Sequence, residues 1–125
     1  MDTPAEYPCP CCGHRTLERP PGSYDICPVC FWEDDDLQLR WPDMPGGANS
    51  PSLIDSQLAH AELGAMEYRF TGIVRMPAPD EPLDGGWRPI DLAVDDFEPV
   101  GTHQAPWPAD LTALYWWRPT FWRRS

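Results

Sequence analysis

The sequence predicts a small, irregular α+β domain, and three observations favour this fold class. First, 17 prolines and 9 glycines in 125 residues favour turns over long helices or an extended sheet. Second, all five cysteines lie between positions 9 and 30, in two short motifs. Third, residues 52–64 combine helical spacing of apolar residues with start and stop signals. A chain of this length supports one hydrophobic core at most.

The two cysteine motifs, Cys9-Pro10-Cys11-Cys12-Gly13 and Cys27-Pro28-Val29-Cys30, predict a metal site. Two residues between cysteines let the backbone turn so that both sulfurs reach one ion, and proline restricts the φ angle of that turn. Treating the motifs as equivalent places Cys11 opposite Val29. The ligands are then Cys9, Cys12, Cys27 and Cys30. Four thiolates suit tetrahedral zinc, so the N-terminal part is predicted to be a zinc ribbon with a structural Zn²⁺.

Other ligand sets and another metal stay open. Cys11 or His14 can replace one of the four cysteines in alternative sets. Iron is the other metal, because paired cysteine knuckles also hold a single redox-active iron in rubredoxin, which would make this chain an electron carrier. Four cysteines leave no coordination position for water, which argues against catalysis at the metal.

A hairpin is expected to bring the two knuckles together. Residues 14–17 and 24–26 can each form a short strand, and residues 19–23 have the proline, glycine and serine typical of a tight connection. The ion would then act mainly by holding this region in its folded structure.

The chain resembles a known family, the bacterial cysteine-rich CPCC proteins. The resemblance rests on Tyr7-Pro8-Cys9-Pro10-Cys11-Cys12-Gly13 and on the run from Pro21 to Asp35, which contains Cys27-Pro28-Val29-Cys30-Phe31-Trp32. It continues less strictly through Gly46-Gly47-Ala48-Asn49, a helix and Arg69-Phe70, and so covers about residues 6–78. The family has no assigned activity, so the resemblance implies a metal-binding module and little more.

An acidic run follows the aromatic pair Phe31-Trp32, and three interpretations compete for it. In the first, the aromatic pair packs over the knuckle while the acids solvate a loop or favour a helix N-terminus through its dipole. In the second, the acids form a hard-cation site, and in the third they form a binding surface for a basic partner. We take the partner-binding residues to be Glu33, Asp34, Asp35 and Asp36.

The main helix is predicted over residues 52–64. Ser52 can cap it with Asp55 three positions later, and Gly64 suits its end. An apolar stripe would contain Ile54, Leu58, Ala61 and Ala65. Residues 66–74 fit either a short helix or an extended segment.

We expect residues 1–80 to form a CPCC-type zinc-ribbon domain and residues 81–125 a Trp/Pro-rich C-terminal extension. Five of the seven tryptophans lie in this extension. They either pack on the first part and complete its core or form an interaction surface. Arg118, Arg123 and Arg124 make the chain end locally basic, and pairing with the acidic stretches is the simpler role for them.

Charge and composition narrow the function. A formal net charge of −11 opposes nucleic-acid binding and favours a basic protein as the partner. The sequence has no nucleophile elbow, phosphate loop or HExxH helix, so we expect no enzyme. A signal peptide and a membrane span are not visible, and paired cysteines of this kind indicate the cytoplasm. We therefore expect a zinc-binding protein with an acidic interaction surface, for example an immunity protein or antitoxin. The alternatives are a rubredoxin-like iron carrier and a nucleic-acid-associated zinc ribbon.

Overall fold

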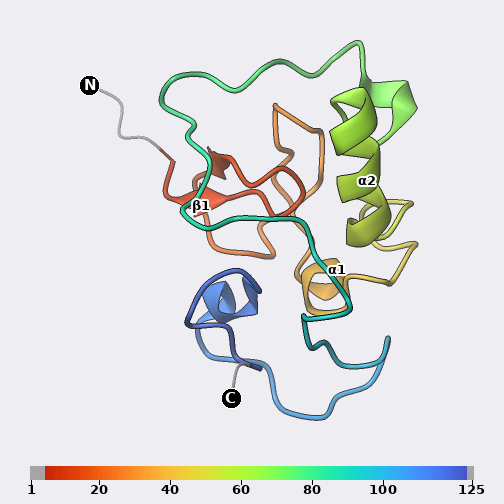
Figure 1. Ribbon diagram of the computed structural model, residues 1–125, viewed down its shortest axis with the longest axis vertical. Helices are drawn as coiled ribbons and strands as arrows, with labels where there is room; N and C mark the ends of the chain where they lie inside the picture. The colour runs from red at the N-terminus through yellow and green to blue at the C-terminus, as the bar shows by residue number, and fades with distance from the viewer. Residues whose placement is uncertain (1–4, 124–125) are drawn as a thin grey trace.

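The computed structural model describes residues 5–123 and has few regular elements, joined by long irregular segments (Figure 1). The strands are β1 (Tyr7–Pro8) and β2 (Arg15–Leu17), and the helices are α1 (Asp36–Arg40) and α2 (Leu53–Leu63). The structure also has two 3₁₀ turns, η1 (Tyr68–Phe70) and η2 (Leu111–Leu114). A small α+β fold is therefore confirmed at this level. Within residues 5–123 there is no helix with the length and apolarity needed to cross a bilayer.

The strand pairing differs from the predicted hairpin. β1 pairs antiparallel with β2, with Tyr7 opposite Leu17. The segment 24–26 forms no strand; Ile26 instead bridges Glu33, and the Cys27 N–H donates to the Trp32 carbonyl over 2.9 Å. Each cysteine motif thus closes its own hairpin, and the predicted pairing of residues 14–17 with 24–26 is wrong. The reason is local: a knuckle reverses the chain, so its own flanks meet with the smallest loop-closure cost.

The acidic run begins helix α1. Asp35 is the N-cap, and one of its carboxylate oxygens accepts from the N–H groups of Leu37 and Gln38. Asp36 lies in the first turn and Arg40 in the last, where their charges suit the helix dipole. A helix N-terminus at the acidic run is one of the expected interpretations, whereas the side-chain cap by Asp35 was not predicted.

Helix α2 has the predicted ends but a different buried face. The Ser52 hydroxyl accepts from the Asp55 N–H, and Gly64 ends the helix in the left-handed conformation at φ 83°. The predicted apolar stripe is wrong, because Leu58 is 65% exposed. The buried residues are Leu53, Ser56 and Gln57. Gln57 faces irregular loops whose backbone groups need polar partners, since it donates to the Pro10 carbonyl and accepts from the Ile90 N–H. The Ser56 hydroxyl donates to the Ser52 carbonyl. The undecided segment 66–74 contains η1.

The C-terminal segment lies beside α1 and under the cysteine motifs (Figure 1). It contributes Leu114, Tyr115, Trp116 and Trp117 to the same buried cluster as the cysteines. Trp87, Trp107 and Trp122 are partly buried against that cluster. Two tryptophans of the segment are therefore fully inside the core, and three lie at its edge.

Asp84 ties the two parts of the chain together. It is 3% exposed, and its carboxylate accepts from Arg15, Trp117 and Arg118 at 2.7 to 3.1 Å. Its backbone N–H donates to the Gly13 carbonyl over 2.8 Å. One side chain thus holds the N-terminal hairpin, the mid-chain segment and the C-terminal segment in a fixed arrangement.

Candidate metal centre

The two knuckles have the same backbone geometry although their sequences differ. The N–H of Gly13 donates to the Cys9 carbonyl over 2.6 Å, and that of Phe31 donates to the Cys27 carbonyl over 2.8 Å. Gly13 has φ 81° and Phe31 has φ 71°, so both occupy the left-handed region. At Gly13 a side chain is also excluded, since a Cβ would lie 2.4 Å from the Trp87 ring. Phe31 shows that the second knuckle keeps its shape without glycine.

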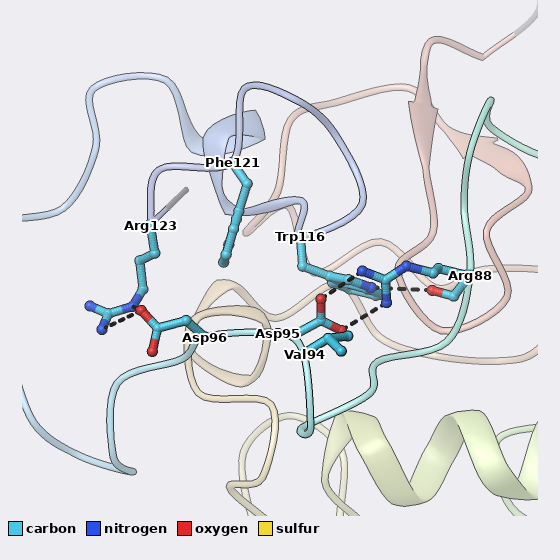
Figure 2. A pocket seen from close by; sticks show the side chains of 7 residues that line it. All are labelled: Arg88, Val94, Asp95, Asp96, Trp116, Phe121 and Arg123. Carbon is cyan, nitrogen blue, oxygen red and sulfur yellow. Dashed lines mark hydrogen bonds and ion pairs between the residues drawn. The ribbon is translucent and has the colours of Figure 1, made fainter. Parts of the chain in front are cut away.

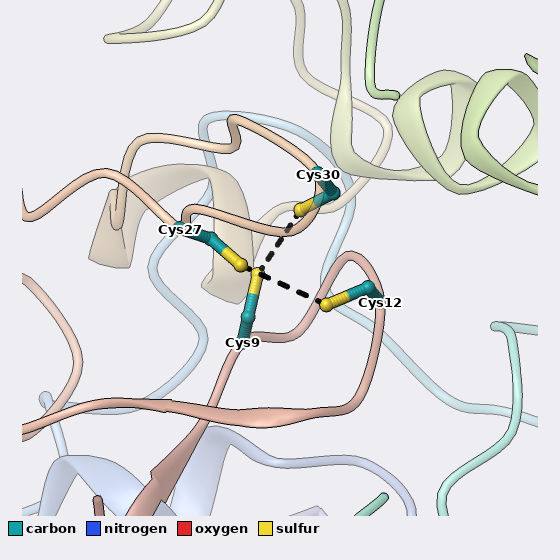
Figure 3. A group of neighbouring side chains, drawn as sticks. All are labelled: Cys9, Cys12, Cys27 and Cys30. Carbon is teal, nitrogen blue, oxygen red and sulfur yellow. Dashed lines mark hydrogen bonds between the residues drawn. The ribbon is translucent and has the colours of Figure 1, made fainter. Parts of the chain in front are cut away.

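Four cysteine sulfurs converge on one point between the knuckles (Figure 3). These are the sulfurs of Cys9, Cys12, Cys27 and Cys30, all within 4.8 Å of one another. A tetrahedron with a metal–sulfur bond of about 2.3 Å has edges of about 3.8 Å. The observed Sγ–Sγ distances of 3.5 Å (Cys9 to Cys30) and 3.8 Å (Cys12 to Cys27) are close to this value. The group could therefore hold a metal ion with little rearrangement.

The thiols cannot all ionise without a cation. Burial raises the pKa of Cys9 and of Cys30 well above the usual value. The pKa of Cys27 is instead lowered, first by a hydrogen bond from Cys12 and then by those from its other neighbours. Burial therefore disfavours ionisation of Cys9 and Cys30, and a bound cation would supply the charge that four thiolates need.

Thr16 adds a contact that the sequence did not reveal. Its hydroxyl, on β2, donates to the Cys27 sulfur over 3.1 Å. Such a donor stabilises the thiolate form of the ligand and fixes its orientation. From the sequence, Thr16 could have been placed near the sulfurs only by the alternation of side chains along β2. That inference depends on the correct pairing of β2 with β1.

The alternative ligands lie outside this group of four. Cys11 is buried in the core, and burial raises its pKa. The His14 Nδ1 lies 2.8 Å from the Glu81 carbonyl. Within residues 5–123, no other set of three or more Cys, His, Asp or Glu side chains has a metal-holding arrangement, so the acidic run does not provide a hard-cation site.

The predicted partner-binding residues divide into two pairs. Asp34 and Asp35 are buried, at 1% and 3% exposure. Asp34 accepts from the backbone and hydroxyl of Ser23, and Asp35 accepts from α1 and from the Ala48 N–H. Both are therefore removed from the predicted surface, because their oxygens satisfy buried donors. Glu33 and Asp36 remain partly exposed.

The fold and the site define a class of protein: a small, irregular domain with two cysteine knuckles that bring four thiols together for a metal ion. The chain belongs to the cysteine-rich CPCC family, whose family model matches residues 7–81. This confirms the resemblance noted from residues 6–78. The matched region contains both knuckles, α1, α2 and η1, whereas most of the C-terminal segment lies beyond it. A search of curated proteins gave no match.

Proposed function

We propose that this protein is not an enzyme, that its four cysteines hold one structural Zn²⁺, and that its acidic surface binds a basic protein. Zinc is supported by four cysteines that leave no position for water, and by two Sγ–Sγ distances close to the edge of a tetrahedral zinc site. All four cysteines are at most 2% exposed. This burial favours a structural role over electron exchange with a partner. The missing glycine of the second knuckle does not argue against iron, because Phe31 adopts the same φ region as Gly13.

The arginine pairing carries the partner proposal. Each of the eight arginines among residues 5–123 makes an ion pair with a carboxylate. Figure 2 shows two of these pairs along one cleft, Arg88 with Asp95 and Arg123 with Asp96. Many exposed carboxylates have no ion pair with any arginine of residues 5–123, among them Glu18, Asp43, Asp55, Glu62 and Asp80. The surface field is therefore negative, which attracts a basic protein and repels phosphate.

The same pairing weakens the nucleic-acid alternative. Arg118 is held by Asp84, which it shares with Arg15, and Arg123 is held by Asp96, so both cations already have a carboxylate partner within the chain. Arg124 lies outside the described residues. An immunity protein or antitoxin that covers the basic site of a toxin is one biological form of the proposed activity, and five free thiols suit a reducing compartment such as the cytoplasm.

Metal analysis with a visible spectrum tests the metal. We expect one equivalent of zinc and a colourless protein, whereas iron bound by four thiolates would be red. Cys27→Ser should lose the ion and unfold the N-terminal region, because binding at such sites contributes roughly 10–16 kcal/mol. Cys11→Ser is the matched control and should retain one equivalent. Loss of the metal from Cys11→Ser would show that the ligand set is wrong.

A pull-down with the full zinc-loaded chain tests the partner. Basic proteins from the source cells should be retained at low salt and released at high salt, because the attraction is screened. A charge-matched acidic protein of unrelated sequence serves as the control bait. Retention of no basic protein beyond that control would refute the proposed function.

A further inference from the structure

A small groove lies beside the second knuckle and is not part of the metal site. Its volume is about 150 Å³. The walls include Ile26, Phe31, Met66 and Phe70, and Glu33 and Arg69 lie at its rim. Pockets for small organic ligands are usually about 300–1,000 Å³. This groove has room for one side chain of a partner rather than for a cofactor.

Phe31 places its ring at this groove in spite of its backbone conformation. A bulky residue at φ 71° is uncommon, and the equivalent residue of the first knuckle is glycine. The Phe31 ring stacks on Phe70, with ring centroids 4.3 Å apart, and remains partly exposed. Strained residues gather where a side chain serves a function. The knuckle turn requires this φ, and the chain carries a phenylalanine there whose ring forms one wall of the groove.

The groove is fixed to the metal centre. The Phe31 N–H donates to the Cys27 carbonyl, and the Met66 N–H donates to the Cys30 carbonyl, each over 2.8 Å. The backbones of Phe31 and Met66, on two walls of the groove, are therefore hydrogen-bonded to cysteines of the proposed metal site. A groove formed before binding loses less conformational entropy when a partner arrives.

The rim of the groove favours a positively charged side chain of a partner. Glu33 has no ion pair with any arginine of residues 5–123, and its backbone is held by Asn49 through two hydrogen bonds of 2.8 and 2.9 Å. Arg69 does not oppose a second cation strongly, because Glu67 accepts from it over 2.6 Å. The charges of Asp35, Asp36 and Glu33 raise the pKa of nearby Tyr24, which confirms a negative field at this end of the hairpin.

The adjoining strand edge favours an extended occupant. Ile26 and Glu33 form an antiparallel bridge in which the flanking residues make the hydrogen bonds. The N–H and C=O of Ile26 therefore face away from the hairpin and bond to no residue among 5–123. The Ile26 side chain is 46% exposed. An extended peptide can pair with such an edge and place alternate side chains in the groove.

We propose that this groove receives an extended segment of the basic partner, in which one apolar side chain packs against the stacked rings of Phe31 and Phe70 and a neighbouring lysine or arginine contacts Glu33. This inference rests on the proposed function, since it names the surface by which the basic protein is bound. It replaces Asp34 and Asp35 with an aromatic groove as the centre of the acidic surface.

Three synthetic nonapeptides test the groove on the zinc-loaded, ¹⁵N-labelled full chain. The first alternates lysine and leucine, the second has glutamate for lysine, and the third has serine for leucine. We expect the first to bind with amide shift changes centred on Ile26, Phe31 and Phe70, and the others to bind at least tenfold more weakly. Equal binding of all three peptides, or shift changes centred elsewhere, would overturn the inference.

Variants separate the groove from the general charge. Phe31→Gly suits the left-handed φ, so it should keep the zinc and the remaining amide spectrum but bind the lysine–leucine peptide at least tenfold more weakly. Ile26→Ser alters an exposed side chain and should weaken binding as well. Glu33→Gln should weaken binding several-fold, whereas Glu62→Gln, on the exposed side of α2, removes the same charge and should change nothing. Equal effects of the two glutamate variants would mean that only the overall field attracts the peptide.

The pull-down distinguishes this inference from the proposed function. If wild type and Phe31→Gly retain a basic protein equally, the partner proposal stands and the groove is the wrong surface. If wild type retains no basic protein, the proposed function fails and the inference falls with it.

Discussion

Asp34 and Asp84 are buried to a similar extent, at 1% and 3% exposure, yet their pKa values move in opposite directions. Burial raises the pKa of Asp34 to about 6, because the donors from Ser23 are neutral. Burial also acts on Asp84, but hydrogen bonds from Arg118, Trp117 and Arg15 outweigh it and lower the pKa. The charge of the donors, rather than burial alone, decides the sign.

The raised pKa of Asp34 predicts a pH effect on stability. The folded state holds a proton on Asp34 that the unfolded state has already lost, so this residue makes the protein less stable as pH rises from about 4 to about 6. Asp34→Asn removes the ionisation. The free energy of unfolding of Asp34→Asn minus that of wild type should increase over this window by up to roughly 3 kcal/mol. Urea unfolding of the two proteins, prepared with the same metal content, at several pH values measures the difference, in which any effect of a metal cancels. A difference that stays constant with pH would contradict the prediction.

For single residues, the sequence predicts the role of the cysteines but not that of the acidic residues Asp34 and Asp35. Cysteine spacing carries the site because two thiols separated by two residues must turn toward each other, whatever surrounds them. The role of Asp34 and Asp35 depends on which donors are buried near them. Ser23 and Ala48 supply those donors from other parts of the chain, and no local pattern indicates this.

Helix α2 shows which features of an element are local. Its cap is encoded within four residues, where the Ser52 hydroxyl accepts from the Asp55 N–H over 3.1 Å. Its buried face is not, because Gln57 is buried by contacts with Pro10 and Ile90. The hairpins follow the same rule: the knuckles were recognised, but their strand partners were assigned across the two motifs instead of within each one.

Ser52→Ala tests the cap. We expect a loss of about 1 kcal/mol in the free energy of unfolding, because the Asp55 N–H would lose its acceptor. Ser50→Ala is the matched control, since this side chain is exposed and two residues before the cap. Chemical denaturation of both variants gives the comparison. Equal losses would show that the cap contributes little.

The whole molecule depends on contacts between α1 and the C-terminal segment. The ion pair of Arg40 with Glu98 is fully buried, with a shortest distance of 2.7 Å. The Arg40 guanidinium also lies 4.6 to 4.9 Å from the ring centroids of Trp41, Trp107 and Trp122. Two of the five tryptophans of the segment, Trp107 and Trp122, therefore pack against a buried charge, while others complete the core. Their number was visible in the sequence, but their common neighbour was not, because it lies more than fifty residues away.

Removal of the Glu98 carboxylate should strongly lower the free energy of unfolding. Glu98→Ala leaves the Arg40 charge buried without a counterion, at a cost of about 3–5 kcal/mol. Asp96→Ala is the control, because it breaks the ion pair with Arg123 at a carboxylate whose side chain is 67% exposed, and such pairs contribute about 1 kcal/mol or less. Thermal or urea unfolding distinguishes the two. Similar losses would mean that the buried pair does not hold the C-terminal segment in place.

The position of Asp84 also sets an order of events during synthesis. The sulfurs of Cys9 and Cys30 are 21 residues apart in sequence, whereas Asp84 joins residues that are 69 positions before it and 34 after it. A ribosome releases the chain from its N-terminus, and short loops close first. The four thiols can therefore come together before the five tryptophans of residues 81–125 are translated. The nascent protein would then have its two cysteine motifs folded but not yet covered by the C-terminal segment. Trp117 and Arg118 complete that contact when they emerge and bond to Asp84.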